Sequence, residues 1–288
     1  MNSEGEASRY GTPPKIIIFV SPHEEANKYL ERLKRILTER GWEILQIVRL
    51  GKNVDKESLM VCDFVLTLGG DGTILYASRE VSKYGKPILG INLGRVGLLT
   101  ELSPEEFLEK IDGIERGEFR VVETMKIIAR ISNEMLQPVL NEYVLMTSKP
   151  GKIVGLQIFV DEEFIAKVLC DGLIVSTPIG STSYALSAGG PVVSDQIEAM
   201  IIVPIAPLYR AMYPLLVSSR SIIKVKIETG WADAWLIADG NIIRKVKEGC
   251  EVVFRRADEK ARFIRVRHSL SRIRKVMSLV GLNVRGKP

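Results

Sequence analysis

The sequence predicts two domains: an N-terminal α/β domain built on a parallel, Rossmann-like sheet, and a β-rich C-terminal domain, with a closing helix that returns to the first domain. Three observations support this expectation. Before residue 119, short apolar runs alternate with amphipathic segments, as in a parallel sheet covered by helices. After it, β-branched runs separated by turn residues replace the helical periodicity. Apolar residues then return to helical spacing over residues 269–282.

The first domain is expected to begin with a strand over Lys15–Val20, after a flexible tail of residues 1–14. The segment 21–24 (SPHE) has a capping-box pattern with proline at the first helical position, which predicts a helix ending at Gly41. A second strand is expected over residues 43–48.

The third predicted strand, residues 64–68, ends in a glycine-rich turn around one carboxylate, and a helix is expected to start at Thr73. A strand that turns sharply into a helix directs backbone N–H groups and the positive helix end toward a site where phosphates can bind. Glycines let a ligand approach the backbone closely. The acid in the turn, Asp71, is the candidate for proton chemistry. The predicted phosphate-binding or ATP-binding residues are Gly69, Gly70, Gly72 and Thr73.

A fourth strand is expected over residues 87–93, followed by a capping box at 103–106 and a helix to about residue 117. In parallel sheets, ligands bind beyond the carboxyl ends of the strands, where the turn at Asp71 lies. We therefore expect an α/β domain over 15–119, with 267–288 packing back on it, and a β-rich domain over 120–266. The strands expected in that second domain are 120–131, 138–146, 153–160, 164–169, 172–176, 200–203, 222–227, 234–238 and 252–254.

The composition narrows the class of protein. The 288 residues carry a net charge of +5, which suits nucleotide phosphates and gives little reason to expect a nucleic-acid partner. Three cysteines without metal-ligand spacing indicate a reduced protein of the cytoplasm. No apolar run approaches the roughly 18 residues of a membrane helix, and the polar start lacks the pattern of a signal peptide, so no membrane partner is expected.

Two further segments carry polar groups that suit a ligand. Segment 171–191 is crowded with Ser, Thr and Gly, and these short donors and acceptors suit ribose hydroxyls and an adenine ring. An ordinary polar loop is the alternative, although apolar residues 173–175 anchor a loop too long for a tight turn. The pair Asn141-Glu142 interrupts an apolar strand and either faces solvent or points into a site. The sequence contains neither a P-loop nor a Gly-x-Gly-x-x-Gly fingerprint.

With these motifs, the chain resembles the NAD kinases from Lys15 to the C-terminal helix. The resemblance rests on the turn 69–73, the pattern Asn92-x-Gly94-x-x-Gly97-x-Leu-Thr over residues 92–100, the pair Asn141-Glu142 and the segment 171–191. The last segment is highly specific, whereas the Gly-Gly-Asp-Gly turn is shared with lipid kinases and phosphofructokinases. Ile179, Ser183 and Leu169 depart from the usual family residues, which are Thr, Ala and a basic residue.

The resemblance implies phosphorylation of the adenosine ribose 2′-hydroxyl of NAD, with Asp71 as the catalytic base. It also implies ATP or polyphosphate as the donor, Mg²⁺ or another divalent cation as the cofactor, and a homodimer or homotetramer. No direct metal ligand is implied. The NAD-binding residues that it implies are Asp71, Gly72, Asn141, Glu142, Lys152, Asp171, Thr182, Ser183, Tyr184, Ala185, Leu186, Ser187 and Asn241.

Two alternatives stay open at the level of the sequence. A lipid or sphingoid kinase would share the turn at Asp71, but the hydroxyl-rich loop suits a dinucleotide better than an acyl chain. A non-catalytic NAD(P)-binding sensor would not need Asp71.

Overall fold

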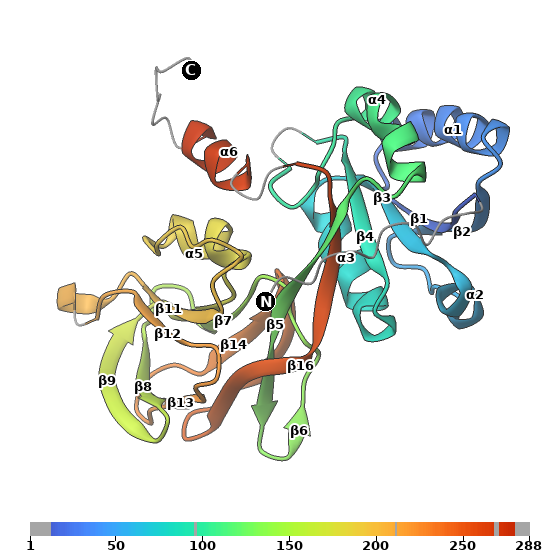
Figure 1. Ribbon diagram of the computed structural model, residues 1–288. Helices are drawn as coiled ribbons and strands as arrows, with labels where there is room; N and C mark the ends of the chain where they lie inside the picture. Colours follow the sequence, from blue (N-terminus) through green and yellow to red (C-terminus); the bar gives the residue numbers. More distant parts are fainter. Residues whose placement is uncertain (1–12, 95–96, 211, 268–270, 280–288) are drawn as a thin grey trace. The chain divides into compact units, whose positions relative to one another are not determined.

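The computed structural model describes residues 13–94, 97–210, 212–267 and 271–279 (Figure 1). The chain forms two compact units: unit 1 consists of Met1–Glu123 and Ala261–Pro288, and unit 2 of Thr124–Lys260. Two long strands, β5 (Arg120–Ile131) and β16 (Glu251–Arg265), run across the boundary, so each unit contains part of both. None of the described helices is long and apolar enough to cross a membrane.

Unit 1 is built on a parallel sheet with the order β2-β1-β3-β4, and the end of β16 pairs with β4 through Arg262 and Phe263. The central residues of β1, β3 and β4 are buried on both faces, as expected for a sheet covered by helices. The bounds of these strands are Lys15–Val20 for β1, Glu43–Arg49 for β2, Phe64–Gly69 for β3 and Pro87–Asn92 for β4.

The helices of unit 1 bury one face each. In α1, Ala26, Leu30, Leu33 and Leu37 recur at helical spacing and join strand side chains such as Leu66 in one core. The helices are α1 (Glu24–Glu39), α2 (Lys56–Val61), α3 (Asp71–Val81), α4 (Pro104–Glu115) and α6 (Ser271–Leu279), with a 3₁₀ turn, η1, at Ser82–Tyr84.

Unit 2 contains two antiparallel arrays whose inner faces share one apolar core. One array has the order β12-β11-β10-β7-β14-β15; the other contains β13, β8, β9 and the unit 2 part of β16. Strand β10 is buried on both faces, because Leu173 and Val175 enter the shared core while Ile174 packs with Ala185 and Val193. The bounds are β6 Glu134–Met135, β7 Glu142–Thr147, β8 Val154–Val160, β9 Glu163–Cys170, β10 Gly172–Ser176, β11 Ala199–Ile205, β12 Leu215–Ser218, β13 Ile223–Ile227, β14 Ala234–Ala238 and β15 Asn241–Val246, with the short helices η2 Gly180–Thr182, α5 Tyr184–Ser187 and η3 Leu208–Arg210.

The predicted fold class is confirmed, with corrections at several element ends. Helix α1 begins at Glu24 with His23 as its N-cap, because the Ser21 N–H still bonds to Leu68 in the sheet. Helix α3 begins at Asp71 rather than Thr73. The strand expected over 138–146 begins at Glu142, since Val139 bridges to another strand. Residues 269–270 and 280–282 of the predicted C-terminal helix lie outside the described residues.

The elements missing from the sequence prediction are short or exposed. Helix α2 has six residues. Strands β6, β12 and β15 are short and consist largely of exposed and half-buried residues.

The capping box of α4 gives a test of the fold. The Ser103 hydroxyl accepts the Glu106 N–H at 3.2 Å, and the Glu106 carboxylate accepts the Ser103 N–H at 2.7 Å. We expect Ser103→Ala to lower the free energy of unfolding by about 1 kcal/mol, because the Glu106 N–H loses its side-chain acceptor. Urea titration measures this change, with Glu109→Ala on the exposed face of α4 as the control. An unchanged urea midpoint in Ser103→Ala would contradict the expected contribution of the cap.

Candidate functional site

The glycine-rich turn of unit 1 joins β3 to α3. A Cβ atom on Gly69 would lie 2.2 Å from Thr73 Oγ1, so the packing of the turn requires glycine at this position. A Cβ atom on Gly70 or Gly72 would meet nothing within 4 Å. Gly70 is also the N-cap of α3 and provides no side-chain cap. The turn therefore leaves open space for a ligand at the N-terminal end of α3.

A pocket of about 990 Å³ lies beside this turn, within unit 1. The first residues of α1 line it as well, and α1 also lacks a side-chain cap. Two helix N-termini therefore face the same space, which favours an anionic ligand such as phosphate. The lining residues are Ser21, Pro22, His23, Glu24, Glu25, Ala26, Leu50, Gly69, Gly70, Gly72, Thr73, Leu93 and Gly94.

Asp71, the first residue of α3, is held by the loop that follows β4. Its Oδ2 accepts the Leu98 N–H and its Oδ1 accepts the Leu99 N–H, each at 2.9 Å. Gly97 precedes these amides at φ 59°, and a Cβ there would lie 2.4 Å from Asn92 Cγ. The carboxylate is therefore fixed in orientation, while each oxygen keeps a second lone pair for a further proton or ligand.

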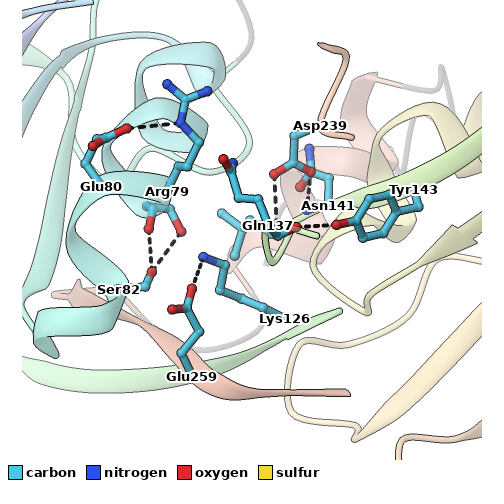
Figure 2. A network of polar contacts seen from close by, with 11 residues as sticks. Arg79, Glu80, Ser82, Lys126, Gln137, Asn141, Tyr143, Asp239 and Glu259 are labelled. Atoms are coloured by element: carbon cyan, nitrogen blue, oxygen red, sulfur yellow. Dashed lines mark hydrogen bonds and ion pairs between the residues drawn. The ribbon is translucent and has the colours of Figure 1, made fainter. Parts of the chain in front are cut away.

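In unit 2, the polar pair Asn141-Glu142 lies at the start of β7 and is 6% and 5% exposed. The solvent-facing alternative for this pair is thus wrong. The Asp239 carboxylate accepts the N–H groups of Leu140, Asn141 and Glu142 at 2.9, 2.8 and 3.2 Å. Figure 2 shows Asp239 beside Asn141. Asp239 itself has a positive φ of 45°. One buried carboxylate therefore fixes the backbone that carries both predicted ligand-binding side chains.

The side chains of this pair end in atoms that the protein does not satisfy. Asn141 Oδ1 and Glu142 Oε2 are buried and have no hydrogen-bond partner among the described residues. The Ser183 hydroxyl donates to the other oxygen, Glu142 Oε1, at 3.3 Å. Because a buried polar atom without a partner costs about 1–3 kcal/mol, the arrangement indicates a site that a polar ligand completes.

Burial also changes the protonation of these carboxyl groups. It raises the pKa of Glu142 to about 8. The nearby Asp239 carboxylate also raises this pKa, whereas the hydrogen bond from Ser183 lowers it. Burial also raises the pKa of Asp239, although the three backbone N–H groups and the nearby Lys126 cation act to lower it. Lys126 is 1% exposed and pairs with Glu259 at 2.6 Å (Figure 2). At neutral pH, Glu142 is therefore mainly a neutral carboxylic acid that can donate as well as accept a hydrogen bond.

The hydroxyl-rich segment serves the fold more than the sequence suggested. Ser176 Oγ donates to the carbonyl of Asn141 at 3.1 Å, and Thr177 Oγ1 donates to that of Leu140 at 2.6 Å. Ser181 Oγ donates to the Pro178 carbonyl at 2.7 Å. These three hydroxyls therefore help to fix the loop and the backbone next to Glu142.

The other predicted NAD-binding residues are distributed over unit 2. Within Thr182–Ser187, Ala185 is fully buried, Thr182 and Leu186 are half-buried, and Tyr184 and Ser187 are exposed. Exposed Asn241 donates to the Asp239 carbonyl at 3.2 Å, and exposed Lys152 lies in a turn.

Asp171 and Glu142 lie at opposite ends of the β7–β10 pair in unit 2. Glu142 pairs with Ser176, the last residue of β10, whereas Asp171 precedes the first residue of that strand. The two ends are separated by roughly 16 Å of extended chain.

Asp239 is the residue that sequence reasoning missed. The Asp-Gly turn after an apolar strand marks its position, but the three amides that it binds lie about a hundred positions earlier in the chain.

Comparison with known proteins matches both parts of the chain to one family. Profiles of the ATP-NAD kinase N-terminal and C-terminal domains match residues 46–119 and 140–266. An NAD kinase of Methanothermobacter thermautotrophicus is 39% identical over 84% of this chain and 88% of its own length. The chain belongs to the NAD kinase family. It is thus an enzyme that phosphorylates NAD, and the lipid-kinase and sensor alternatives are not retained.

Solved structures of the family show the same architecture. An NAD kinase from Archaeoglobus fulgidus, solved in complex with ATP, is 32% identical and matches with a TM-score of 0.76 over 92% of this chain and 99% of its own. Yeast NADH kinase, solved with NADH, is 22% identical with a TM-score of 0.77 over 96% of this chain and 90% of its own, and therefore supports the fold alone.

The raised pKa of Glu142 predicts a pH dependence of stability. Between its ordinary pKa near 4.5 and about 8, the folded protein binds a proton at this residue and the unfolded chain does not. The Glu142 contribution to the free energy of unfolding therefore falls as pH rises through this window, by at most about 1.4 kcal/mol per pH unit. Urea titrations at pH 5, 6.5 and 8 should show a flatter profile in Glu142→Gln. Identical profiles for the two proteins would show that the carboxyl group ionises normally in the fold.

Proposed function

We propose that this NAD kinase transfers the terminal phosphoryl group of ATP to the adenosine ribose 2′-hydroxyl of NAD, with Asp71 as the general base. The observation that carries the proposal is the geometry of Asp71. Its carboxylate is oriented by two backbone amides at the N-terminus of α3, beside a pocket suited to phosphate. A ribose hydroxyl is a poor nucleophile, and an oriented carboxylate within hydrogen-bond reach can take its proton as the phosphoryl group arrives.

The pocket of unit 1 is proposed to hold the donor phosphates, with Gly69, Gly70, Gly72 and Thr73 around them. The Archaeoglobus fulgidus enzyme, which binds ATP, supports ATP over polyphosphate as the donor. When bound, Mg²⁺ or another divalent cation would neutralise phosphate charge.

The described residues provide no group of three or more acidic, His or Cys side chains for a metal. Glu24 and Glu25 nevertheless line the phosphate pocket, and two carboxylates fit a phosphate that carries a cation better than a bare one. The cation is thus proposed to be held mainly by phosphates and water, near these two residues.

NAD recognition is assigned to unit 2. Neutral Glu142 and the Asn141 side chain each offer an unsatisfied oxygen, and a ribose hydroxyl can donate to either of them. Gly72, next to Asp71, is proposed to lie at the NAD diphosphate. The remaining contacts are proposed for Lys152, Asp171, Asn241 and the segment Thr182–Ser187.

A homodimer or homotetramer in the cytoplasm is proposed as the working form. Unit 2 exposes large apolar side chains near its edge strand β12, including Tyr209 at 98%, Tyr213 at 72% and Leu216 at 48%. Such a surface suits a subunit contact. Cys62, Cys170 and Cys250 are free thiols, in keeping with a reducing compartment.

The role of Asp71 can be tested by replacing it with asparagine. We expect Asp71→Asn to bind NAD normally and to lose at least about 100-fold in kcat, because an amide cannot accept the proton. Formation of NADP, detected with an NADP-specific dehydrogenase, measures the loss. Glu109→Gln, on the exposed face of α4, is the control and should be fully active. Near-normal turnover by Asp71→Asn would show that Asp71 is not the general base.

The role of Glu142 can be tested on the affinity for NAD. We expect Glu142→Ala to raise the KM for NAD by about 10-fold or more while the KM for ATP stays within about twofold, because a ribose contact is lost. Initial rates over a range of both substrates measure the two constants. Glu163→Ala, at an exposed position of β9, is the matched control. An unchanged KM for NAD in Glu142→Ala would show that Glu142 does not bind the dinucleotide.

A further inference from the structure

The loop that holds Asp71 is itself held by the C-terminal segment of the chain. Lys275, on α6, donates to the carbonyl oxygen of Gly97 at 2.6 Å. Arg265, at the end of β16, donates to the carbonyl oxygen of Leu99 at 3.1 Å and pairs with Glu101 at 3.0 Å. The loop between Gly97 and Glu101 is thus fixed at both ends by residues more than 160 positions later in the sequence.

Lys275 acts on the same peptide group that orients the carboxylate. The C=O of Gly97 and the N–H of Leu98 belong to one planar amide. Lys275 donates to its oxygen, and its N–H donates to Asp71 Oδ2 at 2.9 Å. A cation on the carbonyl polarises the amide and strengthens the hydrogen bond that its N–H gives to the carboxylate.

Lys275 lies among charged groups of both signs. Lys275 is half-buried, and the groups that face it are Asp71 on α3, Glu101 in the loop, Glu106 on α4 and Arg267 after β16. Glu106 and Arg267 form an ion pair with each other, and Glu101 pairs with Arg265.

We propose that Lys275 is a positioning residue for Asp71, which holds and polarises the peptide between Gly97 and Leu98 so that the carboxylate stays oriented and ionised for catalysis. The proposal rests on the proposed role of Asp71 as the base. It makes α6 part of the catalytic apparatus although Lys275 need not touch either substrate.

Four variants separate this role from a purely structural one. Lys275→Met removes the donor and the charge, Lys275→Gln is a second neutral variant in case the first does not fold, and Lys275→Arg keeps both properties. Arg274→Met removes a charge at the neighbouring, exposed position of α6 and is the matched control. Each variant is assayed for kcat, for the KM of NAD and ATP, and for the pH dependence of kcat.

For the neutral variants we expect kcat to fall by about 10-fold with both KM values within about twofold. The acidic limb of the kcat profile should move to higher pH by about 0.5 to 1 unit, because the ionised carboxylate loses a nearby cation. Lys275→Arg should restore most of kcat and the position of the limb, and Arg274→Met should match the wild type. Amide hydrogen exchange at Leu98 and Leu99 should become faster in the neutral variants, which is a readout independent of activity.

The inference is overturned if a folded neutral variant keeps its kcat within twofold, or if kcat falls while the acidic limb and the amide exchange stay unchanged. A rise in the KM for ATP alone would also overturn it, since Lys275 would then contact the donor directly. Asp71→Asn tests the proposed function separately: normal turnover in that variant removes the base itself, whereas normal turnover in Lys275→Met removes only the positioning role.

Discussion

The geometry of unit 1 depends on one interaction, the acceptance of two backbone N–H groups by the Asp71 carboxylate. Asp71 comes from the turn between β3 and α3, and its donors come from the loop after β4. The hydrogen bonds therefore tie two neighbouring strand ends together at the carboxyl edge of the parallel sheet, where such folds bind ligands. Gly97 is required for the loop to approach Asn92, and Gly69 for the turn to close on Thr73.

Unit 2 also contains a carboxylate that accepts successive backbone N–H groups, but its proposed role differs. The Asp239 carboxylate accepts three successive amides and so fixes Asn141 and Glu142, whose own side-chain atoms are left unsatisfied. In unit 1 the clamping carboxylate is the proposed reactive group, whereas in unit 2 it supports the groups that are proposed to meet the ligand. In both units, a half-buried acid fixes the backbone of a segment next to a proposed binding site.

The sequence predicted the fold well where local patterns decide it. The apolar runs of β1, β10 and β14 predicted the observed bounds, since β1 and β10 are buried on both faces and all five residues of β14 are apolar. The pair Asn141-Glu142 and the turn at Asp71 were also recognisable, because polar or glycine residues interrupt apolar runs there. Local patterns could not reveal the contacts of Asp239 or Lys275, whose partners lie roughly 100 and 180 positions away. They also could not show that Ser176 and Thr177 are used by the backbone of the neighbouring strand.

Proton transfer is proposed for Asp71 and NAD recognition for Asn141-Glu142, and one measurement tests both proposals directly. It is the distance from the Asp71 carboxylate to the adenosine ribose 2′-hydroxyl oxygen in a crystal structure of the enzyme with NAD and a non-hydrolysable ATP analogue. We predict a hydrogen bond of about 2.6–3.2 Å, with a ligand atom on the unsatisfied oxygen of Glu142 or Asn141. A 2′-hydroxyl that lies beyond hydrogen-bond reach of Asp71 and contacts another carboxylate would contradict it.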